Sequence, residues 1–331
     1  MLPTVSIVIP TLNVAGMLED CLVSIARQTY PKEKMEIIVA DAGSTDETLE
    51  TAKRHRVTRI VANPLKTGEA GKAVGVREAR HEIIALIDSD NILPDPQWLA
   101  RMTAPFEDSE IVASEPWEYT YRKTDGYITR YCAMLGMNDP LCLFLGNYDR
   151  KCLLTGQWTE RPRLLEEDRG DYLKVKFDPL EVPTIGANGF CIRRSALEGV
   201  KHEDYLFDVD VLVEMFPKVA VAKVKIGIVH IYTKNFGGFL RKQRRRIHDF
   251  GQYGQVQRRA YPWKRMLFPG GLWFGISCIT VLPLLWQSAK GYLRSFDSAW
   301  WFHPVACWAT LWVYGAGVLR KTITSLWLKM R

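Results

Sequence analysis

Acidic residues are almost absent from the last hundred residues of this 331-residue chain. Residues 231–331 contain two acidic and 16 basic residues, whereas residues 1–230 contain 35 acidic and 28 basic residues. The net charge of +7 therefore combines a front part at −7 with a tail at +14. The basic residues adjoin a long apolar run and mostly lack interleaved aromatic side chains, which argues against a nucleic-acid partner.

Two stretches lack Asp, Glu, Lys and Arg altogether, residues 266–287 and 298–319. Each is long enough to cross the ~30 Å hydrocarbon core of a bilayer as a helix. Seven of the eleven Trp residues lie in 266–331, where they could act as interfacial anchors. The sequence predicts a two-helix membrane anchor, or a hairpin that dips into one leaflet through kinks at Pro283 and Pro304. A buried pair of soluble helices is the alternative.

No C-x-x-C pair occurs among the seven cysteines, so neither a zinc framework nor a disulfide framework is expected. The start of the chain lacks the basic segment and cleavage site of a secretory leader, because residues 1–10 lead directly into an apolar strand. Basic residues within 258–265 and 320–331 flank the two apolar runs, as the positive-inside bias predicts. We therefore expect a protein of the cell inner membrane whose front domain is cytoplasmic.

Apolar runs and helical periodicities alternate through the first ninety residues. Strands are expected at 5–10, 36–40, 59–61 and 83–87, and helices at 17–28, from about 46, and at 70–80. Such alternation predicts an α/β fold with a mostly parallel sheet wrapped by helices.

Two carboxylates follow the run at 83–87, in the triplet Asp88-Ser89-Asp90. The ends of parallel strands form the usual ligand crevice of an open α/β sheet. Carboxylates at this spacing suit a hard divalent cation, and such a cation suits a diphosphate. The triplet therefore indicates metal-assisted chemistry on a nucleotide, although Asp and Ser also favour plain solvated turns.

The first two predicted strands also end in polar segments, Pro10-Thr11-Leu12-Asn13 and 41–46. Both segments face the same crevice if the strands are parallel. Asp41 can accept hydrogen bonds from ribose hydroxyls or from a base N–H. Helix capping or turn formation is the alternative for Asp41.

Four separated motifs resemble the inverting family 2 glycosyltransferases. They are P-T-L-N at 10–13, A-D-A-G-S-T-D at 40–46, G-K-A-V-G-V-R-E-A at 71–79 and I-D-S-D-N at 87–91. The fold of that family is called GT-A, a nucleotide-sugar-binding α/β sandwich. The resemblance is close over residues 4–100 and looser over residues 185–197, which look like the family's small-residue loop and strand beside the acceptor site.

The resemblance implies a donor-binding set. In it, Asp41 would meet the base, most often uracil, and Lys72 would lie near the sugar-nucleotide. The implied donor-binding residues are Pro10, Thr11, Asn13, Asp41, Lys72, Asp88 and Ser89.

The resemblance also implies a metal site. Asp90 would ligate Mg²⁺ or Mn²⁺, beside Asp88. His230 would be a third contact to the metal or the diphosphate, and an ordinary surface histidine at a strand end is the equal alternative. Apart from the family, a bridging cation is suited to the charge that a diphosphate leaving group develops.

Inversion by direct displacement needs a general base for the acceptor hydroxyl. The family usually places an Asp in a pattern like E-D-x-D, and the matching stretch here is F-D-V-D at 207–210. The resemblance makes Asp208 the base and Asp210 its neighbour. Glu203 and Asp204 are competitors, and capping of a following helix is the alternative role.

Acceptor contacts are expected from Glu118 and from the basic segment that contains Arg244, Arg245 and Arg246. Arg pairs bidentately with phosphate, so these residues could hold the phosphate of a polyprenyl-linked acceptor or the donor diphosphate. Their alternative role is to attract anionic headgroups or to keep this end cytoplasmic.

Two further segments are informative. The apolar stretch 131–147 is expected to form either a membrane-dipping acceptor surface or a buried core helix. The polar stretch 155–183 is expected to form a mobile loop over the acceptor site.

The sequence predicts three parts: a GT-A domain at 1–230, a basic amphipathic juxtamembrane segment at 231–265 and a membrane anchor at 266–331. The predicted activity is metal-dependent transfer from a nucleotide-sugar donor, UDP most often, to a lipid-linked acceptor such as polyprenyl phosphate or a lipid-linked saccharide, or to another membrane-proximal acceptor. A nucleotidyltransferase and a catalytically degenerate membrane scaffold are the alternatives. Membrane lipids are expected partners, and an oligomer is possible.

Overall fold

The computed structural model describes residues 2–178, 180–197, 219–256 and 263–329, with side chains described outside 249–268 and 318–331. The chain divides into two compact units. Unit 1 contains residues Met1–Thr120 and Arg161–His230, and unit 2 contains residues Tyr121–Glu160 and Ile231–Arg331. The predicted 1–230 domain is therefore not continuous, because residues 121–160 pack with the C-terminal helices.

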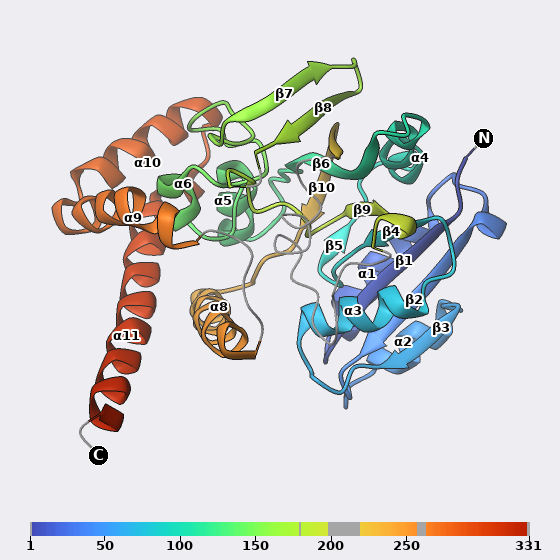
Figure 1. The fold of residues 1–331 in the computed structure, drawn as a ribbon, viewed down its shortest axis with the longest axis horizontal. Coiled ribbons are helices and arrows are strands. Elements are labelled where there is room, and N and C mark those ends of the chain that lie inside the picture. The colour runs from blue at the N-terminus through green and yellow to red at the C-terminus, as the bar shows by residue number, and fades with distance from the viewer. Residues whose placement is uncertain (1, 179, 198–218, 257–262, 330–331) are drawn as a thin grey trace. The chain divides into compact units, whose positions relative to one another are not determined.

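Unit 1 is built on one large sheet (Figure 1). Its strands are β1 (Val5–Thr11), β2 (Met35–Asp41), β3 (Arg59–Ala62), β4 (Ile83–Leu86), β5 (Asn91–Ile92), β6 (Ile111–Tyr119), β7 (Arg163–Asp168), β8 (Tyr172–Phe177), β9 (Phe190–Arg193) and β10 (Ala220–His230). Its helices are α1 (Ala15–Ala26), α2 (Thr48–Arg54), α3 (Gly68–Glu78) and α4 (Trp98–Thr103), with short 3-10 turns at Lys32–Lys34, Ala104–Glu107 and Arg194–Leu197.

The strand order is β3-β2-β1-β4-β9-β6-β10-β8-β7, with β5 paired to β10. The first four strands are parallel, as predicted. The whole sheet is mixed rather than mostly parallel, because β9 runs antiparallel to both β4 and β6, and β8 runs antiparallel to β10.

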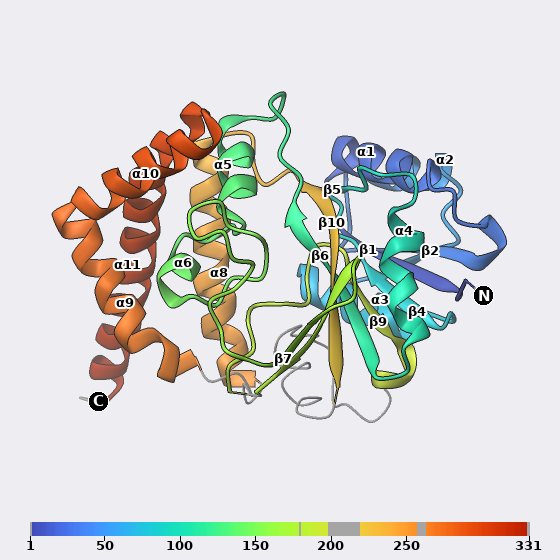
Figure 2. The same ribbon diagram turned by 90° about the horizontal axis from the view of Figure 1, so that it is seen from above.

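The order of the parallel strands creates a switch point between β1 and β4. The chain runs outward from β1 to β3 through α1 and α2, and then returns through α3 to β4 on the other side of β1. Figure 2 shows α1 and α2 on one face of these strands and α3 on the other. Ligands of open α/β sheets bind where the strand order reverses, at the carboxyl ends of the strands.

Two glycines let α3 approach β1 closely. A Cβ on Gly71 would lie 2.8 Å from the Pro10 Cβ, and a Cβ on Gly75 would lie 2.2 Å from a methyl of Val8. Spaced four residues apart, both glycines lie on one face of the helix. The G-K-A-V-G motif is therefore a packing device, and it carries Lys72 on the same helix.

The stretch 155–183 is not a mobile loop at its centre, which corrects the prediction. β7 and β8 form an antiparallel hairpin that extends the sheet beyond β10. The short turn between them permits only antiparallel pairing. Leu173, Val175 and Phe177 alternate along β8 and are buried, a period-2 pattern that the surrounding charges conceal in the sequence.

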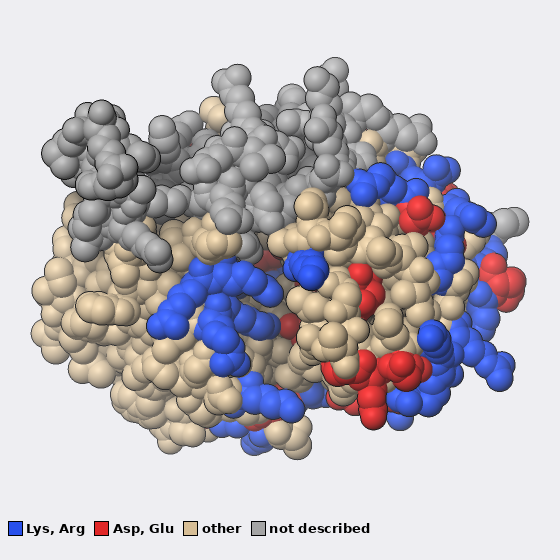
Figure 3. All heavy atoms as spheres, turned by 90° about the horizontal axis from the view of Figure 1, so that it is seen from below, with Lys and Arg blue, Asp and Glu red and all other residues tan. Residues whose placement is uncertain are grey.

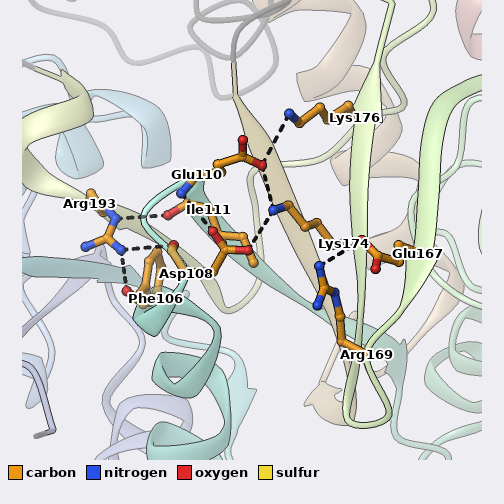
Figure 4. A network of polar contacts seen from close by, with 9 residues as sticks. All are labelled: Phe106, Asp108, Glu110, Ile111, Glu167, Arg169, Lys174, Lys176 and Arg193. Atoms are coloured by element: carbon orange, nitrogen blue, oxygen red, sulfur yellow. Dashed lines mark hydrogen bonds and ion pairs between the residues drawn. The ribbon is translucent and has the colours of Figure 1, made fainter.

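Charged side chains fasten this hairpin to the segment before β6 (Figure 4). Lys174 Nζ lies 2.6 Å from carboxylate oxygens of both Asp108 and Glu110. Arg193 of β9 donates from Nε to the carbonyl of Ile111 at 2.9 Å. The edge of the sheet is therefore fixed by ion pairs as well as by the strand ladder.

Unit 2 is helical. Its helices are α5 (Tyr127–Leu135), α6 (Leu141–Leu145), α8 (Phe236–Val256), α9 (Trp263–Thr280), α10 (Leu282–Ser295) and α11 (His303–Lys329), with a 3-10 turn at Ser298–Phe302. Tyr131, Tyr148 and Phe239 form its core with Trp300. Of the two expectations for residues 131–147, the buried core is confirmed.

The uncharged run 266–287 is not one helix, which corrects the expectation of a straight first span. Helix α9 ends at Thr280, Val281 adopts φ 61°, and the segments Pro269–Thr280 and Leu282–Ser295 meet at 91°. Pro283 stands in the first turn of α10, where its missing N–H costs nothing. Within the described residues, no single helix is long and apolar enough to cross a membrane, although this bent pair could do so by length and composition.

Candidate active site

The ends of β1 and β2 lie side by side, because Thr11 pairs with Asp41 in the parallel register. Thr11 Oγ1 donates to one oxygen of Asp41 at 2.9 Å, and Ser44 Oγ donates to the same oxygen at 2.6 Å. The backbone N–H groups of Gly43 and Ser44 donate to the other oxygen at 2.9 and 2.8 Å. The carboxylate of Asp41 is thus held rigidly at the strand end.

These hydrogen bonds decide the charge of Asp41. Burial acts to raise the pKa of its carboxyl, but the hydrogen bonds from Ser44, Thr11 and Gly43 outweigh burial and hold the pKa below its ordinary value. The side chain is therefore an ionised acceptor at neutral pH, as recognition of a ribose hydroxyl or base N–H requires.

Asn13, a predicted donor contact, is exposed and forms hydrogen bonds with the loop that follows β2. Its Oδ1 accepts a hydrogen bond from the Thr45 N–H at 2.8 Å, and its backbone N–H donates to Ser44 Oγ at 2.9 Å. With φ at 53°, Asn13 occupies the left-handed region that Asn tolerates better than most residues. Asn13 thus ties the loop after β1 to the loop after β2. Pro10, another predicted contact, is buried against α3.

The triplet after β4 reaches the same edge. The N–H of Ile87 bonds to the Val8 carbonyl at 3.1 Å, so the chain stays parallel to β1 up to the triplet. Lys72 is buried on α3, and its Nζ lies 3.6 Å from Asp88 Oδ1. Ser89, which separates the two aspartates in the chain, is buried. A lysine and a carboxylate therefore form a charged pair at the end of β4.

Asp90 and His230 come together although 140 positions separate them in the chain. His230 ends β10, where it pairs with Asn91 of β5 in antiparallel register. The pairing brings His230 Nε2 to 3.4 Å from Asp90 Oδ2. Both side chains are largely buried, at 8% and 16% exposure.

These donors fit a divalent cation only in part. Asp90 and His230 offer a carboxylate oxygen and an imidazole nitrogen, a set that suits Mn²⁺ better than Mg²⁺. Asp88, the other predicted ligand, lies against Lys72 instead. Among the described residues, no three His, Cys, Asp or Glu side chains cluster as a ready metal site. The arrangement matches a cation held by one or two side chains that completes its shell with substrate phosphates.

A buried amide chain, which sequence reasoning missed, connects the triplet to the loop before β9. Asn91 Oδ1 accepts from the Asp88 N–H at 3.0 Å, and Asn91 Nδ2 donates to Asn188 Oδ1 at 3.1 Å. Asn188 Nδ2 then donates to Tyr119 Oη at 3.1 Å. The Tyr119 ring lies 5.4 Å from the ring of His230. The N-G dipeptide at 188–189 and the Asn after D-S-D were the available signals in the sequence.

An ion pair buried at 0% exposure supports the same loop. Lys223 Nζ lies 2.7 Å from Glu115 Oε2, and the other carboxylate oxygen of Glu115 accepts the Gly186 N–H at 3.0 Å. Glu118, the predicted acceptor contact, lies one residue before the end of β6 and pairs with Gly227 of β10. The loop at 185–189 is therefore held from two sides.

We expect Asn188→Ala to lower turnover about tenfold or more, since supporting partners of a site typically matter by 10–100-fold. Asn188 has φ 51°, so Ala also pays about 1–2 kcal/mol for a left-handed backbone. Asn188→Gly is the matched control, because Gly adopts this conformation freely but lacks the amide. Steady-state kinetics and thermal melts separate the two effects: wild-type turnover in Asn188→Gly would leave the amide without a role.

Two further groups of residues were predicted. Asp208 and Asp210, the predicted base and its neighbour, are outside the described residues. Arg244 and Arg245 are exposed on α8 in unit 2. Arg246 is half-buried, 3.9 Å from Asp139, and stacks over the ring of Tyr232.

Comparison with known proteins gives the class of the chain. Residues 6–199 match the sequence profile of the family described as Glycosyl transferase family 2. The match covers more than half of the chain, so the protein belongs to this family and is a glycosyltransferase.

Particular relatives resemble parts of the chain. Glycosyltransferase AglE of Haloferax volcanii is 30% identical over 142 residues, which are 41% of this chain and 46% of AglE. The poly(ribitol-phosphate) beta-N-acetylglucosaminyltransferase TarS of Staphylococcus aureus is 30% identical over 93 residues, 27% of this chain and 16% of TarS. The chain thus spans less than half the length of these curated relatives.

Among solved structures, the mannosyltransferase PcManGT from Pyrobaculum calidifontis superimposes with a TM-score of 0.54 at 16% sequence identity. The superposition covers 95% of this chain and 87% of that one. The similarity supports a fold of the GT-A type.

Proposed function

We propose that this glycosyltransferase transfers a sugar, with inversion and with help from Mn²⁺ or Mg²⁺, from a nucleoside diphosphate to a lipid-linked or membrane-proximal acceptor. The observation that carries the proposal is the set of polar side chains at the carboxyl ends of β2, β1 and β4, where Thr11 bonds to Asp41 and Lys72 lies 3.6 Å from Asp88, next to the triplet that contains Asp90. PcManGT, whose structure is described with GDP-Man and Mn²⁺, supports a nucleotide-sugar donor and a divalent cation.

In this proposal, each described residue has a separate task. The ionised Asp41 accepts hydrogen bonds from the base or ribose, and uracil is the expected base. Lys72 offers a positive charge close to Asp88, where it attracts the diphosphate and keeps the carboxylate oriented. Asp90 and His230 would hold the cation. When bound, the cation stabilises the charge that forms on the leaving diphosphate.

Inversion further requires a base on the acceptor side, and we assign this role to Asp208, with Asp210 as its neighbour. The assignment rests on the F-D-V-D match alone. The loop at 185–189, which the Glu115 carboxylate and the Asn188 amide hold in place, would form the acceptor wall.

We further propose that the enzyme works at the cytoplasmic face of the inner membrane. The 16 basic residues after position 230 support this location, since such residues gather on the cytoplasmic side of membrane segments. A polyprenyl phosphate or a lipid-linked saccharide would be presented at that surface.

Calorimetry on the detergent-purified chain tests the proposal, with UDP-, GDP- and CDP-sugars in the presence and absence of Mn²⁺ or Mg²⁺. We expect one donor to bind, with metal dependence that Asp90→Ala removes. Binding of a nucleoside triphosphate and of no sugar donor would replace the proposal with a nucleotidyltransferase. If no donor binds in the presence of either metal, the interpretation that remains is a catalytically degenerate membrane scaffold.

The arginines of α8 give a second test. We expect Arg244→Gln together with Arg245→Gln to raise the KM for a polyprenyl phosphate acceptor about tenfold or more, because each substitution removes a charged hydrogen-bond donor. The KM for the donor should stay unchanged. Arg246→Gln is the matched control, and its main effect should be on the melting temperature, since Arg246 contacts Asp139 and Tyr232. Equal KM values for the acceptor in the wild type, the double variant and Arg246→Gln would show that Arg244 and Arg245 do not bind the acceptor phosphate.

A further inference from the structure

The outer faces of α9, α10 and α11 in unit 2 are apolar and exposed. We call this surface the apolar ridge and define it by six residues: Trp273, Ile279, Leu282, Trp286, Trp308 and Trp312. Each of the six is between 48% and 76% exposed. In Figure 3, α9 and α10 are on the left, as in Figure 1. The part of the visible surface on that side that is not grey has few Lys, Arg, Asp or Glu side chains.

Helical spacing places the exposed apolar residues of α10 and of α11 on one side of each helix. In α10, Leu282, Leu285, Trp286 and Leu293 are exposed, at intervals of three, one and seven residues. In α11, Val305, Trp308 and Trp312 follow the same kind of interval. Both sets describe one side of a helix, so the apolar side chains point away from the unit along a continuous stripe.

The inner faces of the same helices hold polar side chains. His303 of α11 is fully buried, with Nδ1 2.7 Å from Tyr131 Oη and Nε2 2.8 Å from Gln287 Oε1. Ser288 of α10 is also buried and donates to the Leu284 carbonyl at 3.0 Å. The rest of their buried side is apolar, with Phe274, Leu284 and Cys307 packed together, so these helices are apolar on both their buried and their exposed sides, whereas a water-soluble bundle exposes polar residues. Such a distribution fits an apolar solvent.

The lengths of Pro269–Thr280 and α10 determine how deep the part of the ridge on these two segments can reach. The segment Pro269–Thr280 has 12 residues and α10 has 14. At 1.5 Å per residue, each is about 20 Å long, while crossing the ~30 Å hydrocarbon core takes about 20 apolar residues. The 91° turn at Val281 prevents the two from adding into one straight span. Each segment matches the thickness of a single leaflet more closely than that of a bilayer.

We propose that the apolar ridge inserts into one leaflet of a phospholipid bilayer without crossing it, with the turn at Val281 leading. The tryptophans would lie at the headgroup boundary, which suits an aromatic ring with one polar edge. This inference deepens the proposed function. It rests on that function in one respect only, namely that the acceptor is lipid-linked. An acceptor embedded in that leaflet would be available without leaving the bilayer.

Flotation with phospholipid vesicles tests the insertion, using the full chain after detergent removal. In the variant Ile279→Glu with Leu282→Glu, two exposed side chains at the turn gain charge. We expect the variant to bind at least a hundredfold more weakly, because two apolar side chains lose their burial in lipid. The matched control is Leu65→Glu with Leu164→Glu, which changes two exposed leucines of unit 1 and should bind like the wild type.

Labelling decides between one leaflet and a span. Ser298→Cys, in the connection after α10, and Thr124→Cys, in the loop before α5, both place a thiol on an exposed residue of unit 2. In inverted membrane vesicles we expect an impermeant maleimide to label both variants, and in sealed right-side-out cells neither. Labelling of Ser298→Cys in sealed right-side-out cells would show a span and overturn the one-leaflet insertion.

Two further outcomes would overturn the proposal. Equal vesicle binding by the ridge variant and the control would show that the ridge is not the lipid contact. A wild-type dimer that the ridge variant dissociates, with no vesicle binding by either, would assign the ridge to a second copy of the chain. Circular dichroism melts verify folding in each case. Donor calorimetry reports on the proposed function independently, since vesicle binding needs no donor.

Discussion

Asp90→Asn is expected to lower turnover by about 10²–10³-fold with little change in the free energy of unfolding. The substitution keeps the size of the side chain and removes the charge that a cation needs, and loss of one stabilising contact at developing charge typically costs this much. Asp90 has 16% of its side chain exposed and faces His230 at 3.4 Å, so an amide fits the same space. Sugar transfer measured over a Mn²⁺ titration gives both the turnover number and the apparent metal affinity.

The matched control is Asp20→Asn, an identical change at an exposed position of α1. It should retain wild-type turnover and metal affinity. If the turnover of Asp90→Asn at low Mn²⁺ is within twofold of the wild-type turnover, the D-S-D triplet is only a solvated turn and does not hold a cation. The donor affinity in the absence of metal should be similar in all three proteins.

Lys223→Met is expected to cause the largest loss of stability among single substitutions at the sheet, about 3–5 kcal/mol. The change leaves the Glu115 carboxylate buried at 0% exposure without its cation. The double variant Glu115→Gln with Lys223→Met removes both charges, and replacing a whole buried pair is often nearly neutral. The amide oxygen that Glu115→Gln introduces can still accept the Gly186 N–H. Urea unfolding of the wild type and the two variants in detergent measures the difference.

Lys225 provides the control for this pair on the same strand. It forms an ion pair with Asp168 at 2.7 Å, but the two side chains are 35% and 62% exposed. Exposed pairs contribute about 0–1 kcal/mol, so Lys225→Met should hardly change the urea midpoint. Comparable losses from Lys223→Met and Lys225→Met would mean that burial does not govern the energetics of this edge.

The parallel half of the fold was predictable because each strand there is a short apolar run with a clear end. The runs at 5–10 and 83–87 placed Thr11, Asp88 and Asp90 at one edge, and the structure confirms that arrangement. The role of Lys72 could be placed only through the family resemblance, since nothing in its own spacing shows that two glycines press its helix onto β1.

The sequence pattern could not predict contacts between segments that are distant in the chain. The meeting of His230 and Asp90 depends on a two-residue strand, β5, that no run of apolar residues marks. The β7–β8 hairpin was hidden because its exposed face is densely charged. The turn at Val281 was missed because a proline two residues later reads as a kink within a helix as readily as the start of a new one.

The division of each unit into two chain segments governs how the protein is made. Unit 1 cannot close its sheet until β10 has left the ribosome, and residues 121–160 find their partners only after position 230. At ~5–20 residues per second, the 70 residues between positions 160 and 230 take roughly 4–14 s, during which that segment waits with its tyrosines and leucines uncovered. A shortened chain that ended after β10 would carry this segment permanently unpartnered. The nascent enzyme is therefore expected to need a holding chaperone, or early capture by lipid, before it can finish folding.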